Sequence, residues 1–323
     1  MMRTLFLHVG PTKTGTSAIQ AYFKDRSFAS LHYPKIGRWA DGSHHKLMFA
    51  SHGRKQHGAT EIPDWPLIKE ELIEEIAATE KNVLLSSEVC QPNFVAQIQD
   101  IIETFHFKLI VLLVYRSAQE RAASVYNQSV KDPLVGMHLE PAEFLRQNSE
   151  QLKIRPLYER WYAVSQNIRL LPYFDERPLI DRFCDTVCVE YEPSAVNTIY
   201  NRSMGGHALL AMLLANQILT SDSERSAFFE AMRQLTDFHI WSGNSYPFDA
   251  SEVQEISTQY HDDHMWAMSV IHKVSSKANK TTHHERFTLS PVQCEKIRDL
   301  FIKQGLYSAN QGLIDSSIAR FAS

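Results

Sequence analysis

Residues 8–17 read His8-Val9-Gly10-Pro11-Thr12-Lys13-Thr14-Gly15-Thr16-Ser17 and follow the apolar run Leu5-Phe6-Leu7. A helix-like segment, 18–24, comes directly after them. A strand, a glycine-bounded loop and a helix N-terminus together form a cradle for phosphate, because the N–H groups of the loop and the helix dipole both favour an anion. This stretch predicts an α/β fold with a P-loop-like cradle for phosphate.

The position of the lysine in this loop limits the chemistry. The spacing nearly fits the template G-x-x-x-x-G-K-[ST], since Gly10 and Gly15 lie five apart and Ser17 closes the pattern. Thr16 stands where the lysine belongs, however, and Lys13 lies inside the loop. A nucleoside triphosphatase needs that lysine at the β- and γ-phosphates, beside Mg²⁺. We therefore expect a compact ligand, one phosphate that carries another small anion. The alternative is an ordinary Ser/Thr-rich helix start.

The bulk composition excludes several classes of protein. The 323 residues are 44% hydrophobic and 22% charged, with a formal net charge of −4. That charge argues against a general nucleic-acid binder. No apolar run approaches the ~20 residues that span a bilayer, so we expect no membrane segment. The four cysteines are too few and too scattered for a disulfide framework. A cytoplasmic protein is expected.

The first half of the chain alternates strand-like and helix-like segments. This alternation predicts a three-layer α/β/α fold with a central parallel sheet. The expected strands are 4–9, 83–86, 109–115 and 168–172, and the expected helices between them are 67–79, 118–130 and 152–165. The histidine-rich stretch 38–65 has little periodicity and is predicted to be a long loop that could act as a lid or binding loop.

The C-terminal half is predicted to be helical. Strand signals fade after about residue 190, and the expected helices are 206–219, 221–235, 251–260 and 290–304. We expect a single domain, 1–323, in which 1–190 form a cofactor-binding core. Residues 191–323 would be a mainly helical extension, and the family resemblance described below implies that this extension shapes the acceptor site.

A second group of residues follows the most apolar strand. Residues 109–114 are continuously apolar, as in a central parallel strand, and Arg116 comes directly after that strand, with Ser124 eight residues further on. Ligands of open α/β sheets bind at the carboxyl ends of strands, and arginine suits a phosphate. An ion pair between Arg116 and Glu120 is the alternative.

These two motifs resemble those of the sulfotransferases that use 3′-phosphoadenosine 5′-phosphosulfate (PAPS). Residues 12–17 look like the 5′-phosphosulfate loop, and the arginine and serine in residues 114–126 have the separation of the 3′-phosphate motif. Residues 170–184 are similar to a later strand and helix of these enzymes. The resemblance covers roughly 3–190. The C-terminal Arg-Lys-Gly motif of the cytosolic branch is absent from this sequence.

The resemblance implies a role for each matching residue. Lys13 would contact the bridging oxygen and help the leaving group depart, and Arg116 and Ser124 would hold the 3′-phosphate. The 5′-phosphate and the sulfonate would be held by Thr14, Gly15, Thr16 and Ser17. No metal is implied, since the transfer needs positioning and charge stabilisation at the leaving oxygen.

The acceptor must lose a proton, so a base is needed near the sulfonate. Glu88, after the strand 83–86, is the first choice, by analogy with carbohydrate sulfotransferases; alternatively, it pairs with Lys13 or caps a helix. His45, with His44 beside it, is the second choice, although a loop histidine is commonly exposed to solvent. His8 is expected to be a core or sheet-end residue.

The predicted activity is transfer of a sulfonate from PAPS to a hydroxyl of a carbohydrate or small molecule, with release of adenosine 3′,5′-bisphosphate. Two alternatives stay open. One is a kinase that uses ATP and Mg²⁺ on the same fold, and the other is a non-catalytic nucleotide-binding protein. Neither the acceptor nor the oligomeric state follows from the sequence.

Overall fold

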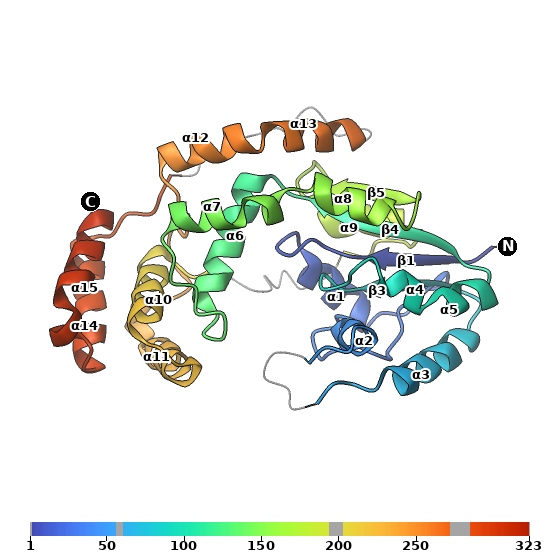
Figure 1. Ribbon diagram of the computed structural model, residues 1–323, viewed down its shortest axis with the longest axis horizontal. Helices are drawn as coiled ribbons and strands as arrows, with labels where there is room; N and C mark the ends of the chain where they lie inside the picture. The colour runs from blue at the N-terminus through green and yellow to red at the C-terminus, as the bar shows by residue number, and fades with distance from the viewer. Residues whose placement is uncertain (1, 56–60, 194–202, 272–284, 323) are drawn as a thin grey trace. The chain divides into compact units, whose positions relative to one another are not determined.

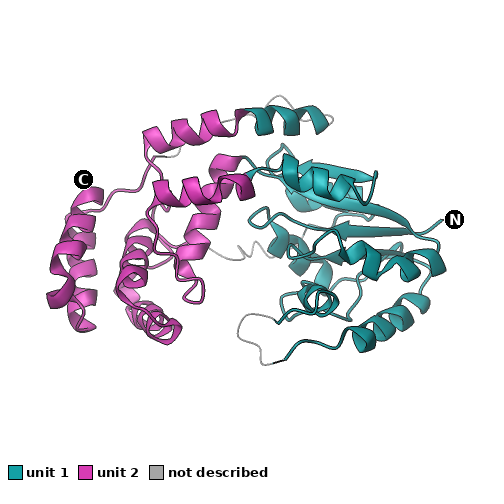
Figure 2. Ribbon diagram, viewed as in Figure 1, with its two compact units in different colours: residues 1–117, 153–200, 262–280 teal, residues 118–152, 201–261, 281–323 magenta. Residues whose placement is uncertain are grey.

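The computed structural model describes residues 2–55, 61–193, 203–271 and 285–322 (Figure 1). The chain forms two compact units (Figure 2). Unit 1 contains residues 1–117, 153–200 and 262–280, and unit 2 contains 118–152, 201–261 and 281–323. Residues 118–152 thus belong to unit 2, although they lie within the predicted core segment 1–190. Within the described ranges no helix is both long and apolar enough to cross a bilayer.

Unit 1 is built on a five-stranded parallel sheet with the order β2-β3-β1-β4-β5. The strands are β1 (Thr4–His8), β2 (Leu31–His32), β3 (Asn82–Ser86), β4 (Lys108–Tyr115) and β5 (Ile168–Pro172). The four strands predicted from the sequence are confirmed to within a residue at each end. The sequence did not indicate β2, which has only two residues. Strands β3 and β2 lie on one side of β1, and β4 and β5 lie on the other. The order of the strands therefore reverses at β1, and ligands of open α/β sheets bind at such a switch point.

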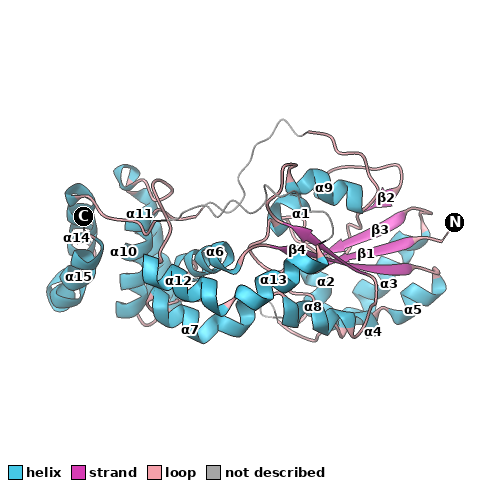
Figure 3. Ribbon diagram, turned by 90° about the horizontal axis from the view of Figure 1, so that it is seen from above, coloured by secondary structure: helices cyan, strands magenta, loops and turns pink. Residues whose placement is uncertain are grey.

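Helices cover both faces of this sheet (Figure 3). On one face, side chains such as Phe6 and Leu112 pack against α1 (Thr16–Lys24) and α9 (Leu179–Thr186). Alternate strand residues point the other way and pack against a second set of helices. These are α2 (His45–Ser51), α3 (Trp65–Ala77), α4 (Phe94–Gln97), α5 (Gln99–Thr104), α8 (Arg155–Tyr162) and α13 (His261–Val270). The predicted three-layer α/β/α fold is confirmed.

The prediction of a long loop at 38–65 is wrong for its first part, because residues 45–51 form helix α2. The N-cap of this helix, His44, makes no capping hydrogen bond through its side chain, so the usual start signal is missing. Leu47 and Met48 are instead fully buried against the sheet. Tertiary packing thus stabilises a short helix that local signals do not indicate.

The predicted helix 152–165 is shorter in the structure, where it corresponds to α8. Helix α7 (Pro141–Leu152) ends in unit 2, and α8 begins at Arg155 in unit 1. The carboxylate of Asp263 accepts hydrogen bonds from the N–H groups of Ile154 and Arg155, at 3.0 and 2.8 Å. An acidic partner from α13 therefore satisfies the start of α8, and nothing near residue 152 in the sequence signals it.

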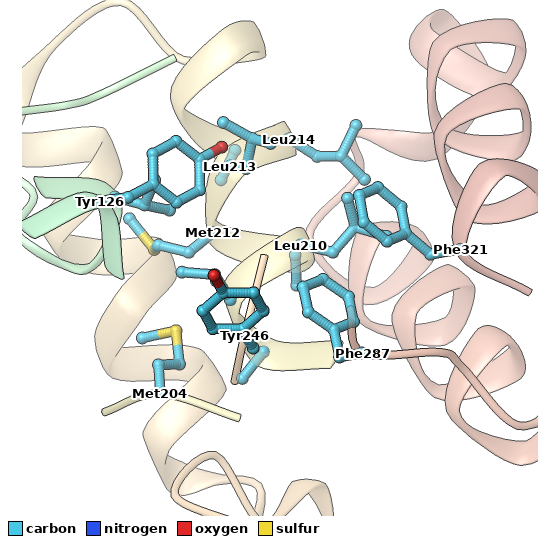
Figure 4. Close-up of a cluster of buried hydrophobic side chains, with 14 of the residues drawn as sticks. Tyr126, Met204, Leu210, Met212, Leu213, Leu214, Tyr246, Phe287 and Phe321 are labelled. Atoms are coloured by element: carbon cyan, nitrogen blue, oxygen red, sulfur yellow. The ribbon is translucent and has the colours of Figure 1, made fainter. Parts of the chain in front are cut away.

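Unit 2 is helical, and its core surrounds α10 (Gly206–Ile218). Residues 206–216 of this helix are all buried, as expected for a helix that is apolar all round. Figure 4 shows Leu210, Leu213 and Leu214 among Tyr126, Phe287 and Phe321. The other α-helices of this unit are α6 (Ala118–Lys131), α7, α11 (Asp222–Gln234), α12 (Ala250–Gln259), α14 (Pro291–Lys303) and α15 (Tyr307–Phe321).

Three helices of unit 2 begin with capping boxes, at Ser221, Asp249 and Ser290. In each box the N-cap side chain and the N3 side chain satisfy each other's main-chain N–H groups. These local signals explain why the predicted helices 221–235, 251–260 and 290–304 are confirmed almost to the residue.

Candidate functional site

The loop between β1 and α1 coils tightly because three of its residues have positive φ angles. These are Gly10 (φ 90°), Lys13 (φ 65°) and Gly15 (φ 83°). Gly15 is the N-cap of α1, and its carbonyl accepts hydrogen bonds from the next turn. A Cβ at Gly15 would lie 2.7 Å from Cδ2 of Leu179, so α9 leaves room only for glycine. Main-chain N–H groups at such a coiled helix start suit an anion.

The hydroxyl groups of the loop are not equivalent. Thr14 is fully buried, and its Oγ1 donates a hydrogen bond to the carbonyl of Pro11 at 2.6 Å. Thr16 is also buried, whereas Ser17 is partly exposed. Because the Thr14 hydroxyl hydrogen stabilises the loop itself, we expect Thr14 to serve a ligand mainly through its N–H group.

Arg116 lies at the carboxyl end of β4 and contacts the same loop. Its Nη1 donates a hydrogen bond to the carbonyl oxygen of Lys13 at 2.9 Å. The guanidinium also lies over the ring of Tyr173, 4.6 Å from its centroid. The structure therefore brings the two predicted cations, Lys13 and Arg116, to one place in unit 1. Ser124 lies on α6 in unit 2, so its pairing with Arg116 stays a prediction.

Glu88 lies directly against the phosphate loop. Strand β3 ends at Ser86, and the N–H of Ser87 donates a hydrogen bond to the carbonyl of His8 at 2.9 Å. This bond holds residues 87–88 beside β1. A Cβ at Gly10 would come within 2.9 Å of the Glu88 Cβ. Glu88 is thus at the sheet edge that the sequence predicted.

The Glu88 carboxylate is held in its ionised form. Nε2 of Gln20, on α1, donates a hydrogen bond to Oε2 at 3.0 Å, and Nε2 of His45 lies 3.7 Å from the same oxygen. Burial by itself raises the pKa of this carboxyl, but His45, the main-chain N–H of Glu88 and the amide of Gln20 outweigh burial and lower the pKa to about 2. Oε1 takes part in neither of these contacts.

His45 is buried and oriented from both of its ring nitrogens. Its Nδ1 lies 2.7 Å from the hydroxyl oxygen of Ser87, and the ring of Trp39 packs edge-on at 4.7 Å. If Ser87 donates to Nδ1, the proton on Nε2 faces Glu88, which satisfies both partners. The structure therefore brings together both predicted bases. The alternative of an exposed loop histidine does not apply to His44 and His45, because both are buried.

His44 and His8 serve the structure of the sheet edge. The N–H of Ser86 donates to Nδ1 of His44 at 3.1 Å, so Nε2 carries the proton that is donated to the carbonyl of Pro34 at 3.0 Å. Burial lowers the pKa of His44 to about 3. His8, as predicted, is a core residue: its Nδ1 lies 2.8 Å from Oγ of Ser86, and burial lowers its pKa to about 4.

Sequence reasoning missed two groups of residues at this edge. Gln20 and Ser87, which contact Glu88 and His45, carry no motif, although Gln20 lies one helical turn after the predicted loop. The second group is a pair, since the hydroxyl of Tyr115 and Nδ1 of His264 lie 2.6 Å apart at the carboxyl end of β4. Their separation of 149 residues explains why the sequence gives no sign of the contact.

Comparison with known proteins adds two structural likenesses. No protein-family model matches this sequence, and no curated protein matches it. A sulfotransferase from Alicyclobacillus acidocaldarius has a TM-score of 0.45 and 13% identity, over 87% of this chain and 100% of that one. Mouse sulfotransferase SULT7A1, complexed with PAP, has a TM-score of 0.33 and 14% identity, over 97% and 87% of the two chains. Because both TM-scores are low, the fold assignment rests on the sheet's own strand order.

Proposed function

We propose that the chain is a PAPS-dependent sulfotransferase that transfers a sulfonate to an acceptor hydroxyl and releases adenosine 3′,5′-bisphosphate. The observation that supports this most is the joining of three elements at one edge of the sheet. The loop carries its cation inside, at Lys13, Arg116 is bonded to that residue at 2.9 Å, and Glu88 packs on Gly10. Anion binding and proton removal would then take place side by side.

The donor, when bound, supplies a sulfonate joined to its 5′-phosphate through a bridging oxygen. The main-chain N–H groups of residues 14–17 and the hydroxyls of Thr16 and Ser17 would hold the two anionic groups. Lys13 would stabilise the charge that develops on the bridging oxygen as the S–O bond breaks. Arg116 would bind the 3′-phosphate, together with Ser124.

Glu88 is the group to which we assign proton removal. Its Oε2 is engaged by Gln20 and faces His45, whereas Oε1 takes part in neither contact. The acceptor hydroxyl would pass its proton towards this carboxylate while its oxygen attacks the sulfur. His45 and Ser87 would orient the carboxylate and spread the charge that the proton brings. A carboxylate with a pKa of about 2 is a weak base, so proton transfer would occur late, as the new O–S bond forms.

Nothing in the loop favours the kinase alternative. Such an enzyme needs a lysine after Gly15 and a metal beside the triphosphate, and Thr16 occupies that position. The acceptor is proposed only as a class, a carbohydrate or other small molecule with a hydroxyl group. All four cysteines lie in described ranges and are free thiols, which agrees with our proposal that the protein works in the cytoplasm.

Calorimetry with two ligands tests the proposal. Adenosine 3′,5′-bisphosphate and ATP with Mg²⁺ are titrated separately into the full chain. We expect the bisphosphate to bind in the micromolar range and ATP with Mg²⁺ at least about 100-fold more weakly. This ratio corresponds to a difference of about 2.7 kcal/mol in the free energy of binding. Tighter binding of ATP would contradict the assignment of the donor and support the kinase.

A further inference from the structure

A second concentration of positive charge lies in unit 1, at the end of α1 away from the phosphate loop. It lines a surface hollow of about 350 Å³ whose walls come from the end of α1, from β2 and the segment after it, and from the residue before β3. The charged and titratable residues that line it are Lys24, Asp25, Arg26, His32, Lys35, Arg38 and Lys81. We call this feature the basic hollow.

The basic hollow is separate from the phosphate loop. Helix α1 has nine residues between Thr16 and Lys24, and at 1.5 Å per residue its two ends lie about 12 Å apart. Ligands at the loop contact the N-terminal end of α1, whereas the hollow is at its C-terminal end. A single small ligand at the loop therefore does not explain the cations at the other end.

The hollow is lined by five cations, Lys24, Arg26, Lys35, Arg38 and Lys81. All of them except Lys35 are held in place by main-chain carbonyl groups. Nζ of Lys24 donates to Ala40, and Nζ of Lys81 donates to Phe28 at 2.7 Å. Nη1 of Arg26 donates to the carbonyl of Tyr22 at 2.9 Å, while its guanidinium stacks 4.1 Å from the centre of the Tyr22 ring.

Arg38 is held in the same way as Arg26. Its Nη1 donates to the carbonyl of Lys24 at 2.7 Å, and its guanidinium lies 5.3 Å from the centre of the Tyr33 ring. A lysine has three N–H donors and an arginine has five, so each of these side chains bonds the main chain and still presents charge. Such ordering removes part of the entropy cost of binding an anion.

Carboxylates offset this charge only in part. Five cations and one acid, Asp25, give the lining a formal charge of +4 with His32 neutral, although the whole chain carries −4. Among the described residues, no ion pair involves any of the five cations. The nearby Glu75, which lies outside the lining, contacts His32 at 3.1 Å and accepts hydrogen bonds from the N–H groups of Lys35 and Ile36. Its carboxylate adds one negative charge, which is fewer than the cations require.

A purely structural explanation accounts for only part of the cluster. Cations at the end of α1, such as Lys24 and Arg26, complement the helix dipole there. Lys35, Arg38 and Lys81 come from other segments, and self-repulsion among five cations destabilises the folded chain unless an anion offsets it. The volume of the hollow also lies at the lower end of the range for small-molecule sites.

We propose that the basic hollow is a second anion site, which binds a small molecule carrying at least two phosphate or sulfate groups. The half-buried ring of Phe28 lines the same hollow and offers an apolar surface to the body of the ligand. This proposal goes beyond the sulfotransferase assignment and does not depend on it, because none of the residues that line the hollow takes part in the site at the loop.

Calorimetry with inorganic pyrophosphate as the probe tests this site. The full chain is first saturated with adenosine 3′,5′-bisphosphate to occupy the loop, and pyrophosphate is then titrated at low salt. The variant is Lys35→Glu, because Lys35 is exposed and its side chain makes no hydrogen bond that supports the fold. Lys108→Glu is the matched control, an exposed lysine of unit 1 that does not line the hollow.

We expect pyrophosphate to bind the saturated wild type with one equivalent and Lys35→Glu to bind it about tenfold more weakly. Lys108→Glu should bind like the wild type. A disulfated disaccharide, titrated in the same way, distinguishes a sulfate-ester ligand from a phosphate ligand. The proposal is overturned if neither anion binds at millimolar concentration, or if both variants weaken binding equally. If the bisphosphate itself fails to bind, the donor assignment falls, and the comparison of the two variants still tests the hollow.

Discussion

The side chain of Arg116 is hydrogen-bonded to the main chain of Lys13, with Nη1 donating to the Lys13 carbonyl at 2.9 Å. The two residues lie 103 positions apart in the sequence. Lys13 has a positive φ of 65°, a conformation that costs a non-glycine residue about 1 kcal/mol or more. The bond from β4 therefore helps to stabilise the strained residue that carries the loop's cation. Arg116 thus has a structural role in addition to any contact with a ligand.

Arg116→Ala should weaken the binding of two nucleotides to different extents. Loss of the bond to Lys13 loosens the loop for every ligand, and a net hydrogen bond contributes about 1 kcal/mol. Adenosine 5′-monophosphate should therefore bind about fivefold more weakly. Adenosine 3′,5′-bisphosphate should lose at least tenfold more than that, because a charged partner of its 3′-phosphate is also removed. Calorimetry with both ligands measures this, and an equal loss would restrict Arg116 to its role in the loop.

Gly15→Ala should destabilise the protein more than alanine at another left-handed glycine. Gly15 has a φ of 83°, and its new Cβ would meet Leu179 Cδ2 at 2.7 Å. Gly53, with a φ of 61°, has no atom within 4 Å of a built Cβ. Gly53→Ala should therefore lower the free energy of unfolding by only about 1 kcal/mol, through backbone strain. Gly15→Ala should lower it by about 2–4 kcal/mol, because the overlap adds to the strain. Urea denaturation measures both.

Adding Leu179→Ala to each glycine variant separates strain from overlap. The second substitution removes the closest overlap of the methyl group at position 15 and leaves only Cε2 of Tyr173 at 3.1 Å. Its own destabilisation should therefore be smaller in the Gly15→Ala background than in the wild type. In the Gly53→Ala background the two effects should add. If they add in both backgrounds, the contact between Gly15 and Leu179 has no energetic importance.

The sequence predicted the sheet and the loop well because their signals are local. Residues 109–114 are apolar without interruption, and the loop carries its glycines at fixed offsets, so both could be placed without any tertiary information. The N-cap of helix α2, His44, makes no capping hydrogen bond through its side chain, and the helix forms because Leu47 and Met48 are buried. The contact between His45 and Glu88, which lie 43 residues apart in the sequence, depends on that helix. From the sequence, the two residues could be named only as separate candidates for the base.

Glu88→Gln should separate binding from turnover. Glutamine keeps the size of the side chain, so the fold and the loop should be retained. Because a negative charge beside an anion site disappears, adenosine 3′,5′-bisphosphate should bind as well as before or slightly more tightly. Sulfonate transfer from labelled PAPS to a panel of hydroxyl acceptors should fall by about 10²–10⁴. A transfer rate equal to that of the wild type would remove Glu88 from its proposed role.

Two buried histidines should make the protein less stable as the pH falls below 6.5. Burial lowers the pKa values of His8 and His44 to about 4 and about 3, from 6.5 in the unfolded chain. The unfolded state therefore binds protons first, so stability is complete above pH 6.5 and is lost as the pH falls towards these folded-state values. Each histidine should cost about 2 kcal/mol by pH 5.

His8→Asn isolates one of these contributions. Asparagine does not titrate and can place its amide near the position of Nδ1, beside Ser86. Between pH 6.5 and 5 the Asp and Glu residues that have low folded-state pKa values contribute little. The loss of unfolding free energy over this window, from urea denaturation, should be clearly smaller in the variant, with His44 and the buried His207 accounting for most of what is left. An unchanged pH dependence would mean that His8 is protonated in the folded protein.

His45→Ala should raise the pKa of Glu88 well above its value of about 2. Burial raises this pKa, and His45 provides the largest opposing contribution, ahead of the amide of Gln20. Without the imidazole, the penalty of burial is offset only by the weaker contacts. NMR of protein labelled with ¹³C at the glutamate carboxyl carbon, with the signal assigned through Glu88→Gln, follows the titration directly. Gln20→Leu is the matched comparison, since it removes the other contact to Oε2 at 3.0 Å and should raise the pKa less. If Gln20→Leu has the larger effect, then the amide holds the carboxylate in its ionised form, and His45 orients Ser87 instead.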